Sequence, residues 1–213
     1  MSVPSVAIRS AACLLSLFLV QASAEEAAEP FSYPTGLLDA PATLTEPAGA
    51  YARLGKPVVK LHTSRLSEVA DLTDAVRLRE GHGSFRRDTL CLAGTENGRP
   101  LMLWLIATDS DRVTEAQLQW APEGRLPEFC RRLPDDKLPI RLGQIGLGMT
   151  KTDIDELVGP ASHEDAAGWR YWFCQRFLRN DRDLQELELN WLAVRFDQAG
   201  RAVQAFISTV VNL

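Results

Sequence analysis

The 213-residue sequence lacks several features that mark common classes of protein. It has no block of basic residues, because Lys and Arg are interspersed with Asp and Glu, and its formal net charge is −5. It also has no apolar run of the roughly 20 residues that cross a bilayer as a helix. The apolar run at residues 11–20 has only ten. These absences argue against nucleic-acid binding and against a membrane-spanning helix.

Signatures of catalysis and of metal binding are missing as well. The three histidines, His62, His82 and His163, are isolated in the sequence, and no Gly-x-Ser-x-Gly elbow is present. The four cysteines show no CxxC spacing, and the histidines show no HxxxH spacing. We therefore expect a protein that is not an enzyme and that holds no metal or other cofactor.

The N-terminus has the pattern of a secretory signal. Arg9 precedes the apolar run, and Ala22-Ser23-Ala24 supplies small residues where a signal peptidase cleaves. We predict a signal peptide at residues 1–24, cleaved after Ala24, and a periplasmic or secreted mature protein. A lipid-bearing cysteine would follow the apolar run, whereas Cys13 stands near its start, so we expect no lipoprotein. Any membrane association would then depend on a partner.

The mature chain divides by composition into an arm and a first folded unit. Residues 25–56 are rich in Ala, Pro, Glu and Thr, which predicts a low-order arm with a few apolar residues to pin it. Residues 57–133 form the predicted first unit. Within it we expect strands at 58–61, 88–92, 101–106 and 113–120, a tight turn at Asn97-Gly98, and a short helix or helical turn at 126–133. The residues expected to pin the arm are Phe31, Tyr33, Leu37 and Leu38.

A second unit is predicted at residues 140–213, after a linker at 134–139. Thr150 can cap a helix with Ile154, Leu157 and Val158 on one face, and Gly159-Pro160 ends it. An aromatic strand follows at 169–173. The two units resemble each other: the segment 67–72 aligns with 152–157, and 105–118 aligns with 194–207. This predicts an α+β fold of two tandem helix-plus-antiparallel-sheet units, with short helices packed on one sheet face.

The last third of the chain also resembles a known family. The runs GLGMTKTDIDELVGPAS and LAVRFDQAGRAVQAFIS, with Trp169 and Tyr171 between them, look like the SmpA/OmlA (BamE-like) outer-membrane assembly lipoproteins. That family belongs to a superfamily that includes the β-lactamase inhibitor protein. The resemblance implies helices packed on one face of a small antiparallel sheet, and a function in binding other proteins rather than in catalysis.

Three cysteines would remain in an oxidising compartment after signal cleavage. We favour a disulfide between Cys91 and Cys130, because it closes a loop of roughly 40 residues within the first unit. Secreted proteins that look like this chain also carry cysteines in the first hairpin and just before the linker. Cys174 would then be a buried single thiol. A disulfide between Cys91 and Cys174 is the alternative.

The aromatic strand is the strongest candidate for a binding surface. If Trp169 and Tyr171 face the core, Trp172 is exposed on the other face, unless a second layer such as the arm covers it. Trp, Tyr and Arg dominate binding hot spots. We predict a non-catalytic module that binds an unidentified protein partner, with an envelope component as one candidate. The alternative is a carrier or sensor of a small apolar ligand in a closed cavity. The candidate binding residues are Trp169, Arg170, Tyr171, Trp172, Trp191 and Arg195.

Overall fold

The computed structural model describes residues 29–82, 86–108, 110–179 and 185–212, and the predicted signal peptide lies outside this part of the chain. The described residues form two α-helices, two single 3-10 turns and thirteen strands. The helical elements are α1 (Leu66–Thr73), α2 (Lys151–Val158), η2 (Pro122–Gly124) and η3 (Asp135–Lys137). The strands are β1 (Ala42–Leu44), β2 (Tyr51–Leu54), β3 (Val58–Lys60), β4 (Arg77–Glu80), β5 (Arg87–Glu96), β6 (Arg99–Ala107), β7 (Glu115–Trp120), β8 (Arg131–Arg132), β9 (Ile140–Leu142), β10 (His163–Glu164), β11 (Trp169–Arg179), β12 (Gln185–Phe196) and β13 (Ala202–Asn212).

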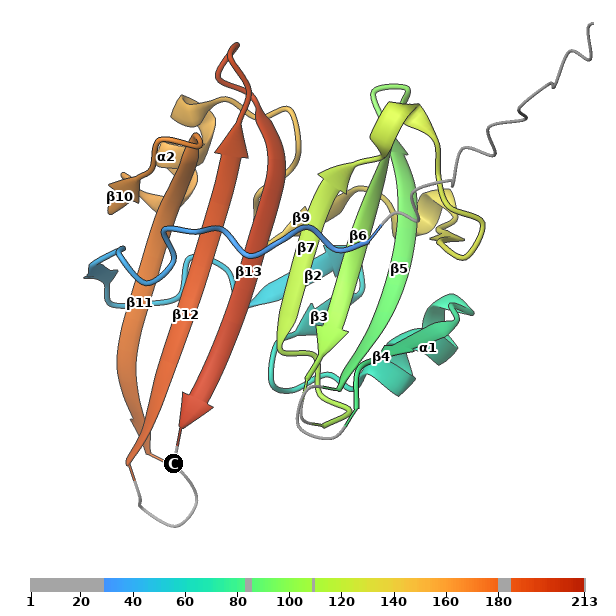
Figure 1. The fold of residues 1–213 in the computed structure, drawn as a ribbon, viewed down its shortest axis with the longest axis horizontal. Helices are drawn as coiled ribbons and strands as arrows, with labels where there is room; N and C mark the ends of the chain where they lie inside the picture. Colours follow the sequence, from blue (N-terminus) through green and yellow to red (C-terminus); the bar gives the residue numbers. More distant parts are fainter. Residues whose placement is uncertain (1–28, 83–85, 109, 180–184, 213) are drawn as a thin grey trace, which may run out of the picture.

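Ten of these strands form one mixed sheet (Figure 1). Its order is β1-β11-β12-β13-β7-β6-β5-β4, with β10 also paired to β11 and β8 to β5. The pairs β1–β11 and β5–β8 are parallel, and the others are antiparallel. Strand β13 pairs with β7, placing Ala205 opposite Leu118. One sheet therefore continues from the predicted second unit into the predicted first unit.

The predicted α+β class of tandem helix-plus-sheet units is wrong. The fold is mostly β, with 48% of the described residues in strands and 13% in helices. Each α-helix has only eight residues, a length of about 12 Å. Strands β11, β12 and β13 have eleven or twelve residues, which is roughly 36–40 Å when extended. Two such short helices cannot form a layer over a sheet of this size.

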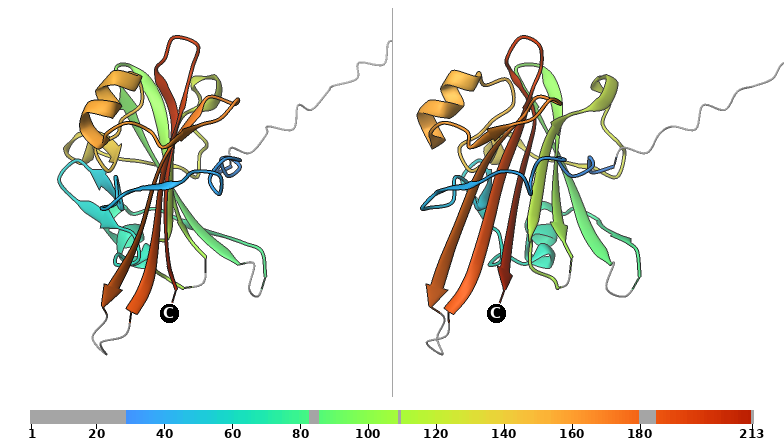
Figure 2. Two further views of the ribbon diagram at one scale, coloured as in Figure 1. Left: turned by 90° about the vertical axis from the view of Figure 1, so that its left-hand side faces the viewer. Right: turned by 60° about the vertical axis from the view of Figure 1, so that its left-hand side comes forward.

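The two faces of the large sheet are covered by different parts of the chain (Figure 2). One face packs against α1, α2 and a small sheet of order β3-β2-β9. A single core between these layers joins both halves of the large sheet, and it includes Leu90, Leu103, Trp172, Leu192 and Ile207. Residues 29–40, which we call the strap, cross the other face, and the chain then passes through β1 at the β11 edge.

Local predictions from turn and cap residues are confirmed. Thr150 caps α2 by accepting a hydrogen bond from the Asp153 amide, and Gly159 ends the helix with φ of 83°. Asn97 and Gly98 both have positive φ between β5 and β6, as a two-residue hairpin turn requires. Among the described residues, no helix has the length and the apolar composition that crossing a bilayer requires.

The segment 126–133, expected as a short helix or helical turn, forms no helix and only a single turn, in which the Cys130 amide donates to the Pro127 carbonyl at 3.1 Å. Its C-terminal part is extended instead, because Arg131 pairs with Leu92 of β5 in parallel and the Leu133 amide donates to the carbonyl of Ala93 at 2.8 Å. Pairing with an existing strand provides hydrogen bonds that a single isolated turn of helix lacks.

Candidate functional site

The strap is attached to the sheet by Tyr33, which reaches a buried carboxylate. The Tyr33 hydroxyl donates to Glu115 Oε2 at 2.7 Å, and its ring meets Phe206 edge-on at 5.8 Å between centroids. The guanidinium of Arg87 lies over the Tyr33 ring at 5.6 Å. Burial, helped by the negative charge of Glu115, raises the pKa of Tyr33 to about 12. The hydroxyl therefore stays a hydrogen-bond donor at physiological pH.

Glu115 is one of the few buried charged groups, at 3% exposure. Burial raises the pKa of its carboxyl above the ordinary value, although hydrogen bonds from Tyr33 and Gln117 and the charge of Arg87 oppose that rise. Gln117 Nε2 donates to Oε1 at 2.7 Å, and Arg87 approaches the same oxygen at 3.4 Å. The strap is thus hydrogen-bonded, through Tyr33, to a polar cluster on this face of the sheet.

Two further hydrogen bonds hold the middle of the strap. The Gly36 amide donates to the Tyr171 hydroxyl at 3.0 Å, and this hydroxyl donates in turn to Asp165. The Trp191 indole Nε1 donates to the Leu37 carbonyl at 3.1 Å. A Cβ at position 36 would lie 2.9 Å from Tyr171 Cε2, so only glycine fits this close approach.

Beyond the strap, the same sheet face carries a contiguous set of apolar side chains. Cross-strand pairing places Phe173 opposite Trp191 and Phe177 opposite Leu187, and Leu189 lies opposite Val210. Residues two apart in a strand share a face. Phe177 is 65% exposed and Val210 is 38% exposed. We call this set the apolar face: Phe173, Phe177, Leu187, Leu189, Trp191 and Val210.

The six predicted binding residues are divided between the two sides of the sheet. Trp169, Tyr171 and Trp191 lie on the strap side, where Phe31 contacts Trp169 at 5.6 Å between ring centroids. Trp169 and Tyr171 are buried at 7% and 0% exposure, and Trp191 is partly buried. Arg195 is exposed on the same side, opposite Trp169. Binding by these residues stays a prediction.

Trp172 and Arg170 lie on the opposite side of β11. Trp172 is 1% exposed and donates from Nε1 to the Gly159 carbonyl at 2.8 Å. Arg170 pairs with Asp155 at 3.0 Å and lies 5.5 Å from the centre of the Trp172 ring. The expectation that Trp172 is exposed while Trp169 and Tyr171 face the helix is therefore reversed. Trp172 and Arg170 pack against α2, and the strap covers the face with Trp169 and Tyr171.

Sequence reasoning missed most of the apolar face. The signal is present in residues 185–191, where Leu187, Leu189 and Trp191 alternate with polar residues at the period of a strand with one apolar side. Phe177 continues that side on β11, eight residues after the predicted Trp169. A strand prediction that extended past Phe173 would have included it.

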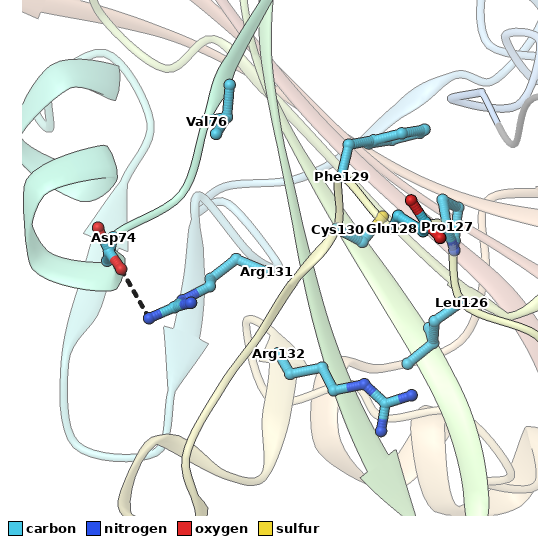
Figure 3. A pocket seen from close by; sticks show the side chains of 9 residues that line it. All are labelled: Asp74, Val76, Leu126, Pro127, Glu128, Phe129, Cys130, Arg131 and Arg132. Atoms are coloured by element: carbon cyan, nitrogen blue, oxygen red, sulfur yellow. Dashed lines mark ion pairs between the residues drawn. The ribbon is translucent and has the colours of Figure 1, made fainter.

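The predicted disulfide between Cys91 and Cys130 is confirmed, and Cys174 is a buried free thiol. A cavity of about 550 Å³ lies beside the disulfide, between the start of β4 and the segment 126–132 (Figure 3). Its lining combines Val76, Leu126 and Phe129 with an ion pair of Arg131 and Asp74 at 2.7 Å. The cavity is open to solvent.

A second open cavity of about 530 Å³ lies where β7 ends and the chain turns from β12 to β13. Arg195 contributes to its lining, and Arg99 stacks over Trp120 there at 4.5 Å from the ring centre. Neither cavity is the enclosed apolar chamber that a carrier of small apolar ligands needs. Within the described ranges, no group of three or more His, Cys, Asp or Glu residues is arranged to hold a metal ion.

Comparison with protein-family models, with curated proteins and with solved structures finds no match. The resemblance to the SmpA/OmlA (BamE-like) family therefore stays a prediction.

Proposed function

We propose that the chain is a non-catalytic protein of the periplasm or the secreted fraction, which binds another protein through the apolar face. The observation that carries this proposal is the exposure of Phe177 and Val210 beside partly buried Leu187, Leu189 and Trp191 on one side of three paired strands. A contiguous apolar patch rimmed by polar residues is typical of a protein interaction site.

Three further observations support the proposal. The apolar face is a sheet surface and not a cavity, so it suits a protein surface better than a small ligand. The stacked pair of Phe173 and Trp191, 4.9 Å apart, offers the kind of aromatic anchor that dominates binding energy. The Cys91–Cys130 disulfide is in keeping with an oxidising compartment.

A crosslinking pull-down from a periplasmic extract tests this function. We expect wild type to capture a specific protein, and a Phe177→Gln, Val210→Thr double variant to lose at least about tenfold of that affinity. The matched control is Leu157→Gln, because Leu157 is 41% exposed on α2, on the other side of the sheet. Circular dichroism and thermal unfolding establish that all three proteins are folded.

The double variant distinguishes the outcomes. Capture by wild type and by Leu157→Gln, with loss in the double variant, supports binding through the apolar face. Equal capture by the double variant, or no specific capture by wild type, contradicts the proposal. If the captured protein is a second copy of this chain, the molar mass in solution measured by light scattering reveals it as a dimer.

A further inference from the structure

The apolar face does not end where the strap begins. Trp191 belongs to both surfaces, because its ring stacks on Phe173 while its indole nitrogen donates to the strap carbonyl of Leu37. Under the strap the surface continues through Tyr171 and Phe206, which are both fully buried. Removing the strap would extend the apolar face into one longer aromatic surface.

We propose that the strap occupies, within its own chain, part of a peptide-binding surface whose ligand is a segment of the partner protein that turns as residues 34–39 of the strap do. The ligand carries two aromatic side chains two residues apart and a glycine three residues after the second. This inference rests on the proposed function, because it names the part of the partner that binds and the segment it must displace.

The strap itself shows which chemistry fits the surface. Phe31 contacts Trp169, and the Tyr33 hydroxyl donates a hydrogen bond to Glu115. Gly36 follows three residues later, where the Tyr171 ring leaves no room for a Cβ. A peptide with this spacing of two rings and a glycine can make the same contacts from another chain.

The way the strap is held makes it replaceable. Residues 29–40 form no strand among the described elements, so no ladder of backbone hydrogen bonds ties them to the sheet. Their polar contacts are a phenol hydroxyl, one backbone amide and backbone carbonyls that meet side chains of the sheet. The rings of Phe31 and Tyr33 add contacts with Trp169 and Phe206. Another segment that adopts the same turn can supply the same groups.

Competition from the strap should lower the apparent affinity of the surface for a free peptide. A tethered segment acts at an effective concentration in the millimolar range, so it outcompetes a free peptide of the same sequence. The apparent affinity for the free peptide rises as the fraction of molecules with an open surface increases. A change that loosens the strap without altering the surface should therefore increase binding in trans.

Gly36→Ala is that change, and a synthetic fluorescent peptide with the sequence of residues 29–40 is the probe. We expect the full-length Gly36→Ala protein to bind the peptide at least about tenfold more tightly than wild type does, by fluorescence anisotropy. The matched control is Leu38→Ala, which should bind as wild type does because Leu38 is 90% exposed on the strap. A peptide that itself carries alanine in place of Gly36 should lose binding to the loosened protein.

Two results overturn the inference. One is a folded Gly36→Ala protein that binds the peptide no better than wild type does. The other is equal binding of the glycine and alanine peptides. If the Gly36→Ala protein does not fold, the two peptides are compared on the wild-type protein at high peptide concentration.

The failure of this inference differs from failure of the proposed function. A partner that is captured through Phe177 and Val210, together with a peptide that does not bind, leaves the apolar face as the interface and removes the strap from it. If the peptide binds but the Phe177→Gln, Val210→Thr variant loses no partner, the strap surface binds peptides and the apolar face is not the interface.

Discussion

Glu115 is a buried carboxyl group whose ionisation links the stability of the fold to pH. It is buried at 3% exposure in the strap side of the sheet, and its pKa is raised by that burial. A carboxyl group with a higher pKa in the folded than in the unfolded state binds protons more readily when folded. Its charge therefore lowers stability above the folded pKa, and this cost disappears as the pH falls through that value.

Replacement of Glu115 by glutamine tests this assignment. We expect Glu115→Gln to unfold at a higher temperature than wild type near about pH 7, with a difference that shrinks as the pH falls toward about 4, the range in which ordinary carboxyl groups titrate. Differential scanning calorimetry across this range measures both midpoints. The control is Glu128→Gln, on an exposed loop. A variant less stable than wild type at every pH would show that the ion pair with Arg87 outweighs burial.

Among the elements, α2 shows how much a local pattern can predict. Thr150 and Asp153 exchange hydrogen bonds with each other's backbone amides at 3.1 and 2.8 Å, and Gly159 stops the helix. All of these contacts lie within ten residues, so the sequence predicts them without knowledge of the fold. The same holds for the Asn97-Gly98 turn between β5 and β6.

Removing the cap should weaken α2 by a predictable amount. We expect Thr150→Ala to lower the free energy of unfolding by about 1 kcal/mol, because it leaves the Asp153 amide without its side-chain acceptor. Thr152→Ala is the matched control, since Thr152 is exposed in the first turn. Urea denaturation of the three proteins gives the comparison, and equal midpoints for the two variants would contradict the capping role.

Other elements could not be predicted because their contacts are distant in sequence. The arm was expected to be pinned by four apolar residues, and three of them, Phe31, Tyr33 and Leu37, contact the sheet while Leu38 is exposed. Which strand each meets depends on pairing partners more than 100 residues away, as for Gly36 and Tyr171. The candidate site shares this limit: Trp191 was predicted, but the strap over it follows only from the fold.

At the scale of the whole molecule, the pairing of β13 with β7 joins the two halves of the large sheet. Ile207 opposite Ala116 and Ala205 opposite Leu118 belong to one core that also contains residues of β5, β6, β11 and β12. The sequence patterns around the two short helices are local, so they predict two separate units. A continuous sheet and a shared core instead favour a single cooperative transition.

Ala205→Asp tests whether the sheet behaves as one body. Ala205 has 0% exposure, so the variant places a carboxylate without a partner in the core, at an expected cost of about 3 kcal/mol or more. Gln198→Asp is the control, because it makes the same charge change in the exposed turn between β12 and β13. Hydrogen exchange followed by NMR reports each half separately. In a single cooperative sheet, the slowest amides of β5 and β6 lose as much protection as those of β11 and β12. Loss confined to β11–β13 would mean that the two halves unfold independently despite the pairing that joins them.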